Sequence, residues 1–237
     1  MFSTNNKKIL VLCCIFILLL FHQYVIAGEL KPKVGVTVIE SSGNVDSTSI
    51  KLDGELLYEQ KRSSQIMKSG LRYAETEEVK SANSSYIEFK NNNKLTDKIL
   101  YLYQSAKLEG DEFVGYNYRI EFNGGLGVNV DEINIETGPG FTYEDTDDED
   151  KGFPSYRNFL KYTYKFSDRI SGSSCVEHIR DLEEVNNHRT KWITQADIQL
   201  TEGFGLRASR EFSYINMPPE GSRMHDWTTN FTLVMSF

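Results

Sequence analysis

The sequence predicts an all-β protein, a closed antiparallel up-and-down transmembrane β-barrel of about 12 strands. Three observations lead to this fold class: an export signal at the start, strand-and-turn composition throughout, and a strictly alternating segment at the end. In residues 227–237 every second side chain belongs to a largely apolar row, Trp227, Thr229, Phe231, Leu233, Met235 and Phe237. The other row is mostly polar, and successive strand residues point to opposite faces. A barrel with lipid outside and water inside needs this pattern in every strand.

The first 27 residues have the order of a secretory signal. Lys7 and Lys8 precede an apolar run at 9–21, and the sequence Val-Ile-Ala before Gly28 is a small-residue cleavage site. The run is about 13 residues, too short for a membrane-spanning helix of about 20. We therefore expect a cleaved signal peptide at 1–27 and a single outer-membrane β-barrel domain at 28–237.

Charge, cysteine content and hydropathy exclude several other classes of protein. The chain of 237 residues has a formal net charge of −8, and loss of two lysines with the signal makes it −10. Such an acidic protein is a poor partner for nucleic acid. Cys175 is the single thiol after residue 27, so no disulfide can form within the exported chain. No later segment approaches 18 consecutive apolar residues, which excludes a helical membrane protein.

Short runs of aromatic and β-branched residues, separated by turn residues, predict the strands in order. They cover 34–38, 50–58, 66–78, 79–90, 98–108, 113–123, 133–143, 156–166, 169–182, 191–200, 204–216 and 227–237. Turns are expected at 42–44, at the asparagines 91–93, at 167–168 and at 201–203, with longer loops at 144–152 and 217–224. If both termini are periplasmic, the turns near 91–95, 167–168 and 201–203 lie on the periplasmic side and are short, and the longer loops at 144–152 and 217–224 lie outside, as in known barrels.

Two positions depart from the simple strand pattern. Gly138-Pro139-Gly140 interrupts one strand, and because proline donates no ladder hydrogen bond we expect a bulge or bend there. Arg210 lies in the apolar row of its strand, where a charge facing lipid is unfavourable.

Several short motifs together resemble a known family. They are the turn at 42–44, the strand segment 136–143 (ETGPGFTY), the turn at 166–168, the segment 203–206 (GFGL) and Pro218-Pro219-Glu220 before the last strand. On these residues the chain resembles the family of salt-induced outer-membrane proteins, which are exported barrels of unknown biochemical role. The resemblance spans nearly the whole chain after the signal. It implies an outer-membrane barrel and carries no catalytic residues.

The polar row of the strands is the candidate functional surface, because it faces the lumen of a barrel. The charged members of this row are Lys51, Asp53, Glu55, Arg119, Glu121, Glu136, Arg157, Lys161, Lys165, Lys191 and Asp197. Opposite charges on neighbouring strands, such as Glu136 beside Lys161, are expected to pair. Such pairs either plug the interior of a structural component of the envelope or line a narrow polar path for small solutes.

Catalysis is the alternative reading of the same strands. His178, near Ser173, Ser174 and Glu177, or His188 could serve a lipid or peptide hydrolase in the barrel wall, although no spacing suggests a triad. A second alternative is a secreted soluble β protein that binds a ligand. The acidic run 144–150 could hold a cation, yet it lacks the order of a dedicated calcium loop. The sequence therefore predicts no catalytic residue, no metal site and no cofactor.

The terminal strand also predicts the partners of the protein. Its apolar row, Phe231, Leu233, Met235 and Phe237, is expected to face outer-membrane lipid and to be recognised by the barrel assembly machinery when strands 1 and 12 close. We expect a monomer.

Overall fold

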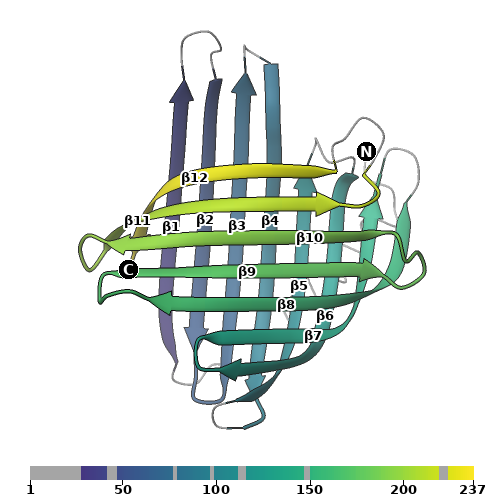
Figure 1. Ribbon diagram of the computed structural model, residues 1–237, viewed down its shortest axis with the longest axis horizontal. Coiled ribbons are helices and arrows are strands. Elements are labelled where there is room, and N and C mark those ends of the chain that lie inside the picture. Colours follow the sequence, from purple (N-terminus) through teal and green to yellow (C-terminus); the bar gives the residue numbers. More distant parts are fainter. Residues whose placement is uncertain are drawn as a thin grey trace.

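The computed structural model describes residues 28–41, 47–76, 79–96, 99–111, 116–146, 150–218 and 224–237. The described residues form twelve strands that close into one antiparallel barrel, each strand paired with its neighbours in the sequence and β12 with β1 (Figure 1). The strands are β1 (Glu29–Ser41), β2 (Ser47–Glu59), β3 (Ser63–Thr76), β4 (Val79–Lys94), β5 (Leu100–Asp111), β6 (Tyr116–Val130), β7 (Ile133–Asp145), β8 (Lys151–Lys165), β9 (Ile170–Asp181), β10 (His188–Gln199), β11 (Phe204–Ile215) and β12 (His225–Ser236). The predicted fold class is confirmed. The described part of the chain contains no helix long and apolar enough to cross a membrane.

Several predicted boundaries are wrong: β1 begins at Glu29 and β8 at Lys151, each five residues before its predicted start, and β8 thereby takes in the end of the predicted loop 144–152. The asparagines at 91–93 are inside β4, where they pair with Gln104, Tyr103 and Leu102 of β5, and the connection follows at 95–99. The turn preference of asparagine is outweighed there by the hydrogen bonds of the sheet. β6 runs on to Val130, seven residues beyond its predicted end at 123. Glu144 and Asp145, assigned to the acidic loop, are the last residues of β7, whereas 147–149 lie outside the described residues.

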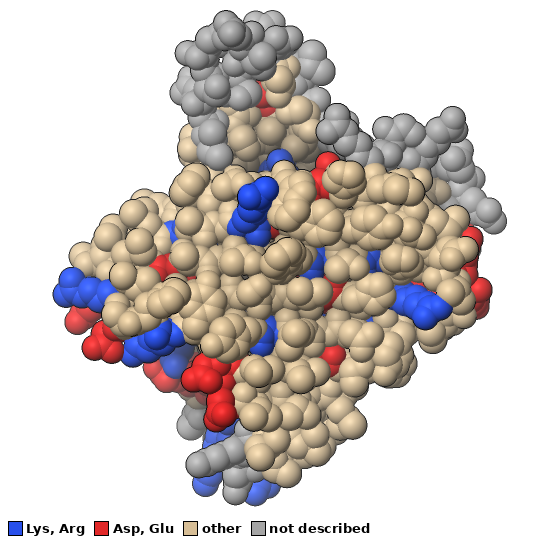
Figure 2. Space-filling view, viewed as in Figure 1, with Lys and Arg blue, Asp and Glu red and all other residues tan. Residues whose placement is uncertain are grey.

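The outward and inward faces follow the alternation of the strands. Large apolar side chains such as Leu206, Phe231 and Leu233 are exposed on the outer surface. Figure 2 shows that the face over β8–β12 is mostly uncharged, with acidic and basic side chains gathered toward its edges. Figure 1 shows these strands crossing over β1–β4 on the opposite wall, as the tilted strands of a barrel must.

At Gly138-Pro139-Gly140 the structure shows a gap in strand pairing without a shift of register, so the expected bulge does not form. The pairing of β6 and β7 is interrupted between Asn123↔Gly140 and Leu126↔Thr137. A Cβ atom on Gly138 would lie 2.1 Å from the carbonyl oxygen of Gly124, so the two backbones approach closer than any side chain permits. Pro139, which has no N–H to donate, lies within this interruption.

The seam between β1 and β12 is the shortest strand pairing in the barrel. Four register pairs join these strands, from Lys33↔Ser236 to Val36↔Leu233, whereas thirteen join β1 and β2. Beyond the last pair, the hydroxyl groups of Thr37 and Thr232 are 2.6 Å apart. In Figure 1, the upper ends of β1–β4 extend well above β12. The seam therefore depends on few backbone hydrogen bonds. Recognition of Phe237 by the assembly machinery stays a prediction.

Candidate functional site: the charged lumen

The charged residues singled out in the sequence lie on the strand face opposite the exposed apolar row. Register places Lys51, Asp53 and Glu55 on one face of β2, away from Leu52 and Leu56. The others occupy the corresponding face of β6 (Arg119, Glu121), β7 (Glu136), β8 (Arg157, Lys161, Lys165) and β10 (Lys191, Asp197). Lys165 lies at the rim, where its ammonium group is 2.8 Å from Asp168 in the turn after β8.

The first group of luminal charges is centred on Glu136, and we call Lys90, Tyr101, Tyr103, Glu136, Arg157, Phe159 and Glu177 the packed cluster. The side chain of Glu136 is 1% exposed. Its carboxylate accepts hydrogen bonds from Nη1 of Arg157 at 2.8 Å, from the hydroxyl of Tyr101 at 2.6 Å and from Lys90. Lys90 belongs to β4, three strands from β7 along the wall, so its ion pair with Glu136 crosses the interior.

The expected pair of Glu136 with Lys161 does not form. The register puts Phe159 opposite Glu136 and Asn134 opposite Lys161. Glu136 is paired instead with Arg157 and Lys90. Sequence reasoning included Arg157 in the inward row but missed Lys90, because alternation identifies the face of a residue and not its partner across the barrel.

Aromatic side chains complete the packed cluster. The ring of Tyr103, which is almost fully buried, lies beneath the cationic groups of Lys90 and Arg157, 5.6 Å and 5.3 Å from its centroid. The ring of Phe159 is at similar distances from the same two cations. Such contacts stabilise desolvated cations. Both rows of the sequence segment 98–108 are apolar. Alternation of polarity therefore could not show that Tyr101 and Tyr103 face the lumen.

A second group of luminal charges lies near the end of the barrel at which β5 connects to β6 and β7 to β8. It comprises Lys107, Glu109, Tyr116, Arg119, Glu121, Glu144 and Arg189. Arg119 contacts Glu109 at 3.1 Å and Glu144 at 2.7 Å, and its guanidinium is 4.0 Å from the ring centroid of Tyr116. Arg189 on β10 pairs with Glu121 on β6. This pair also crosses the interior, since β6 and β10 are not neighbours.

A third set of luminal pairs lies on a different part of the wall, which we call the hydrated wall: β1, β2, β10 and β11. Four of its pairs are Lys33–Glu55 at 3.6 Å, Lys51–Asp53 at 3.3 Å, Lys191–Glu211 at 2.6 Å and Arg207–Asp197 at 2.6 Å. Their side chains are between 25% and 44% exposed, although all point inward. Exposure inside a barrel means contact with water in the lumen.

The histidines are not assembled into a hydrolytic site in the described part of the chain. His178 faces outward, its Nδ1 is 2.9 Å from the hydroxyl of Thr190, and its ring centroid is 5.4 Å from that of His188. Ser173 and Glu177 lie on the opposite, inward face of β9. Their adjacency in the sequence therefore does not bring them together. The described residues include no cluster of three or more metal-binding side chains, and cation binding by 144–150 stays untested because 147–149 lie outside them.

Residues 34–237 match the profile of a family described as a protein of unknown function, DUF481. The chain belongs to the DUF481 family. The match covers most of the barrel, and it agrees with the expected resemblance to exported barrels of unknown role. That DUF481 members are salt-induced stays a prediction. No curated protein matches this chain.

Solved structures similar to this DUF481 chain are outer-membrane barrels. The COG4313 outer membrane channel from Pseudomonas putida F1 has a TM-score of 0.54 at 12% identity, over 91% of this chain and 98% of that one. The translocator domain of the autotransporter NalP from Neisseria meningitidis has a TM-score of 0.49 at 12% identity, over 98% of this chain and 95% of that one. The likeness to the channel shows a shared fold, that of an outer-membrane β-barrel.

Proposed function

We propose that this DUF481 protein is a non-enzymatic channel of the outer membrane that passes small polar solutes along the hydrated wall. One observation carries the proposal: inward charged side chains on β1, β2, β10 and β11 keep a quarter or more of their surface exposed. The packed cluster occupies the other side of the lumen. The passage is therefore off-centre and narrow.

The charges of the hydrated wall bear on the class of solute. Each cation in it, such as Lys191 or Arg207, lies within ion-pair distance of a carboxylate. A wall with balanced charges produces no strong field of one sign, so electrostatic focusing of one ion type is weak. We expect little discrimination between small anions and cations, and passage of neutral polar solutes as well.

A structural role in the envelope is the second candidate, and the packed cluster supports it. Ion pairs from β4 to β7 and from β6 to β10 tie opposite parts of the wall together. A barrel filled in this way resists deformation whether or not solutes pass. A hydrolytic role has less support, because His178 and Ser173 point to opposite faces of β9.

Conductance in planar bilayers tests the channel. The protein, purified from membranes, is compared with Ser213→Trp, which places an indole on the inward face of β11 opposite Lys191. The matched control is Phe212→Trp, one residue away on the outward face of the same strand. We expect small, stable conductance steps for the parent and the control, and steps reduced by half or more for Ser213→Trp.

Absence of steps from a correctly folded parent would refute the channel and favour the structural role. Equal conductance of the two tryptophan variants would place any passage away from the hydrated wall. Folding of every variant is checked by heat-modifiable electrophoretic migration.

A further inference from the structure

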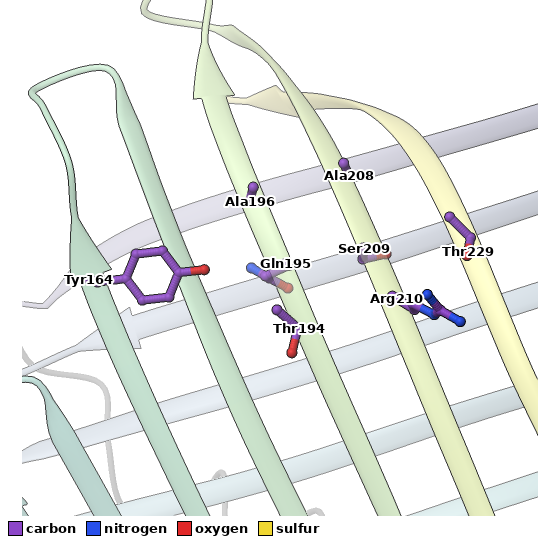
Figure 3. A pocket seen from close by; sticks show the side chains of 8 residues that line it. All are labelled: Tyr164, Thr194, Gln195, Ala196, Ala208, Ser209, Arg210 and Thr229. Carbon is purple, nitrogen blue, oxygen red and sulfur yellow. The ribbon is translucent and has the colours of Figure 1, made fainter.

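A groove of about 230 Å³ lies on the outward wall, across β8–β12. The side chains of Tyr164, Thr194, Ala196, Ala208, Arg210 and Thr229 line it, and Figure 3 shows them arranged across these neighbouring strands. This wall is the lipid-facing surface of a barrel with this fold. The groove is therefore open to the membrane and separate from the lumen.

The floor of the groove is made by residues with little or no side chain. Gly172, Ala196 and Ala208 pair directly in register across β9, β10 and β11. The ring of Tyr164 lies over Gly172, where a Cβ atom would be 2.3 Å from a ring carbon. At the opposite end, Phe231 pairs with Ala208. Because the ring of Tyr164 covers Gly172, the open floor is formed by Ala196 and Ala208 on adjacent strands about 4.8 Å apart, an apolar surface that suits a hydrocarbon chain.

A polar row borders this floor. Thr194, Arg210 and Thr229 pair with one another in register on β10, β11 and β12. The guanidinium of Arg210 is 4.4 Å from the ring centroid of Trp227. Tryptophan side chains in membrane proteins concentrate at the membrane–water interface. This contact holds the charge of Arg210 beside a side chain of the type that favours the interface.

Arg210 differs from the inward arginines in having no acidic partner. Arg119, Arg157 and Arg207 each contact a carboxylate, whereas Arg210 forms no ion pair with any residue in the described ranges. An uncompensated cation on a lipid-facing wall is unfavourable unless an anion meets it. Arginine pairs in a bidentate manner with phosphate, and threonine hydroxyls can donate to the same oxygens.

We propose that this groove binds an anionic phospholipid of the surrounding membrane. The lipid phosphate accepts hydrogen bonds from Arg210, Thr194 and Thr229, and one acyl chain lies on the floor formed by Ala196 and Ala208. Thr229 belongs to the part of β12 that has no pairing with β1, so the lipid would lie next to the short seam. The proposal does not depend on whether the lumen conducts.

Native mass spectrometry of the whole barrel in neutral detergent tests the site, with added phosphatidylglycerol as the probe. We expect retained lipid in the parent, and retention about tenfold weaker in Arg210→Gln, equivalent to about 1.4 kcal/mol. Ala208→Leu fills the floor without changing charge, and it should weaken retention to a similar extent. Arg210→Lys should recover part of the binding. Arg169→Gln, which removes a charge in the exposed turn after β8, is the matched control and should bind like the parent.

Two further binding experiments test whether the ligand is a phosphate-containing lipid. A neutral diglucosyl diacylglycerol, which has acyl chains and no phosphate, should not be retained, and equimolar inorganic phosphate should not displace phosphatidylglycerol. Retention by Arg210→Gln equal to the parent would overturn the proposal, as would equal retention of the neutral glycolipid. Displacement by inorganic phosphate, or unchanged retention in Ala208→Leu, would overturn the assignment of a lipid. Heat-modifiable migration verifies that each variant is folded.

Discussion

The packed cluster and the hydrated wall contain the same kinds of ion pair in opposite environments. Arg157 and Glu136 have side chains 5% and 1% exposed, whereas Lys191 and Glu211 have side chains 42% and 25% exposed. The difference arises from what surrounds each pair. Tyr101, Phe159 and side chains from non-adjacent strands enclose the first, and lumen water reaches the second.

The contrast shows that an inward charge in this barrel has one of two physical roles. A desolvated pair such as Arg157–Glu136 is strongly coupled, because removing one partner leaves a buried charge without compensation. A solvated pair such as Lys191–Glu211 contributes little to stability, because water screens both charges. Residues of the first kind join non-adjacent strands through buried contacts, and those of the second kind line the passage that we propose. The following predictions test this division.

The largest effect is expected for Glu136→Gln. This substitution leaves Lys90 buried without an acidic partner, while Arg157 keeps its ion pair with Glu177, and it should lower the free energy of unfolding by about 3–5 kcal/mol. Denaturant unfolding in detergent, followed by tryptophan fluorescence, measures the change. A loss below about 1 kcal/mol, the level typical of exposed pairs, would remove the distinction between the two regions.

A smaller effect is expected at the seam between β1 and β12, where Thr37 and Thr232 are both buried. Thr37→Val leaves the buried hydroxyl of Thr232 without the partner it has at 2.6 Å, at a cost of about 1–3 kcal/mol. The double variant Thr37→Val with Thr232→Val removes both hydroxyl groups and should be closer to the parent than the single variant. A double variant less stable than either single one would show that the hydroxyl pair is not the source of the effect.

Within the hydrated wall, Asp197→Asn should change stability by no more than about 1 kcal/mol. It frees the charge of Arg207, now 2.6 Å from Asp197, and it adds one net positive charge to the passage. We expect reversal potentials in a salt gradient to shift toward anion preference. An unchanged reversal potential in a conducting barrel would mean that permeating ions do not encounter this pair.

The smallest effect concerns the exposed pair of Lys165 and Asp168 at the rim. The hydrogen bond from Lys165 lowers the pKa of Asp168 below its usual value of 3.8. Because the folded-state pKa is depressed, the contribution is present above pH 3.8 and is lost as pH falls through the folded-state value. Solvent screens this pair, so unfolding midpoints of the parent and Asp168→Asn should differ barely at pH 7 and coincide once the pH is below the folded-state pKa of Asp168. A clear difference at pH 7 would contradict the weak coupling assigned to exposed pairs.

Local alternation predicted much of the barrel, and specific residues show where it was insufficient. The rows around Arg157 and around Leu233 were identified correctly, because a strand has a period of two residues that needs no tertiary information. The asparagines of β4 were misassigned because their turn preference is also local and was outweighed by pairing with β5. Arg210 was recognised as an exception in its row. Its neighbours in the groove could not be found, because they depend on the register of five strands.

The sequence by itself determined the class of barrel, the order of its strands and the face on which each charge lies, since these follow from short-range periodicity and from the chemistry of turns. Only the tertiary structure decided that Glu136 pairs with Lys90 and not with Lys161, and that Lys191 remains in water while Arg157 does not. Closure of the barrel brings non-adjacent strands to within side-chain reach across the lumen. Those distances depend on register and curvature accumulated around the whole wall, which no single segment encodes.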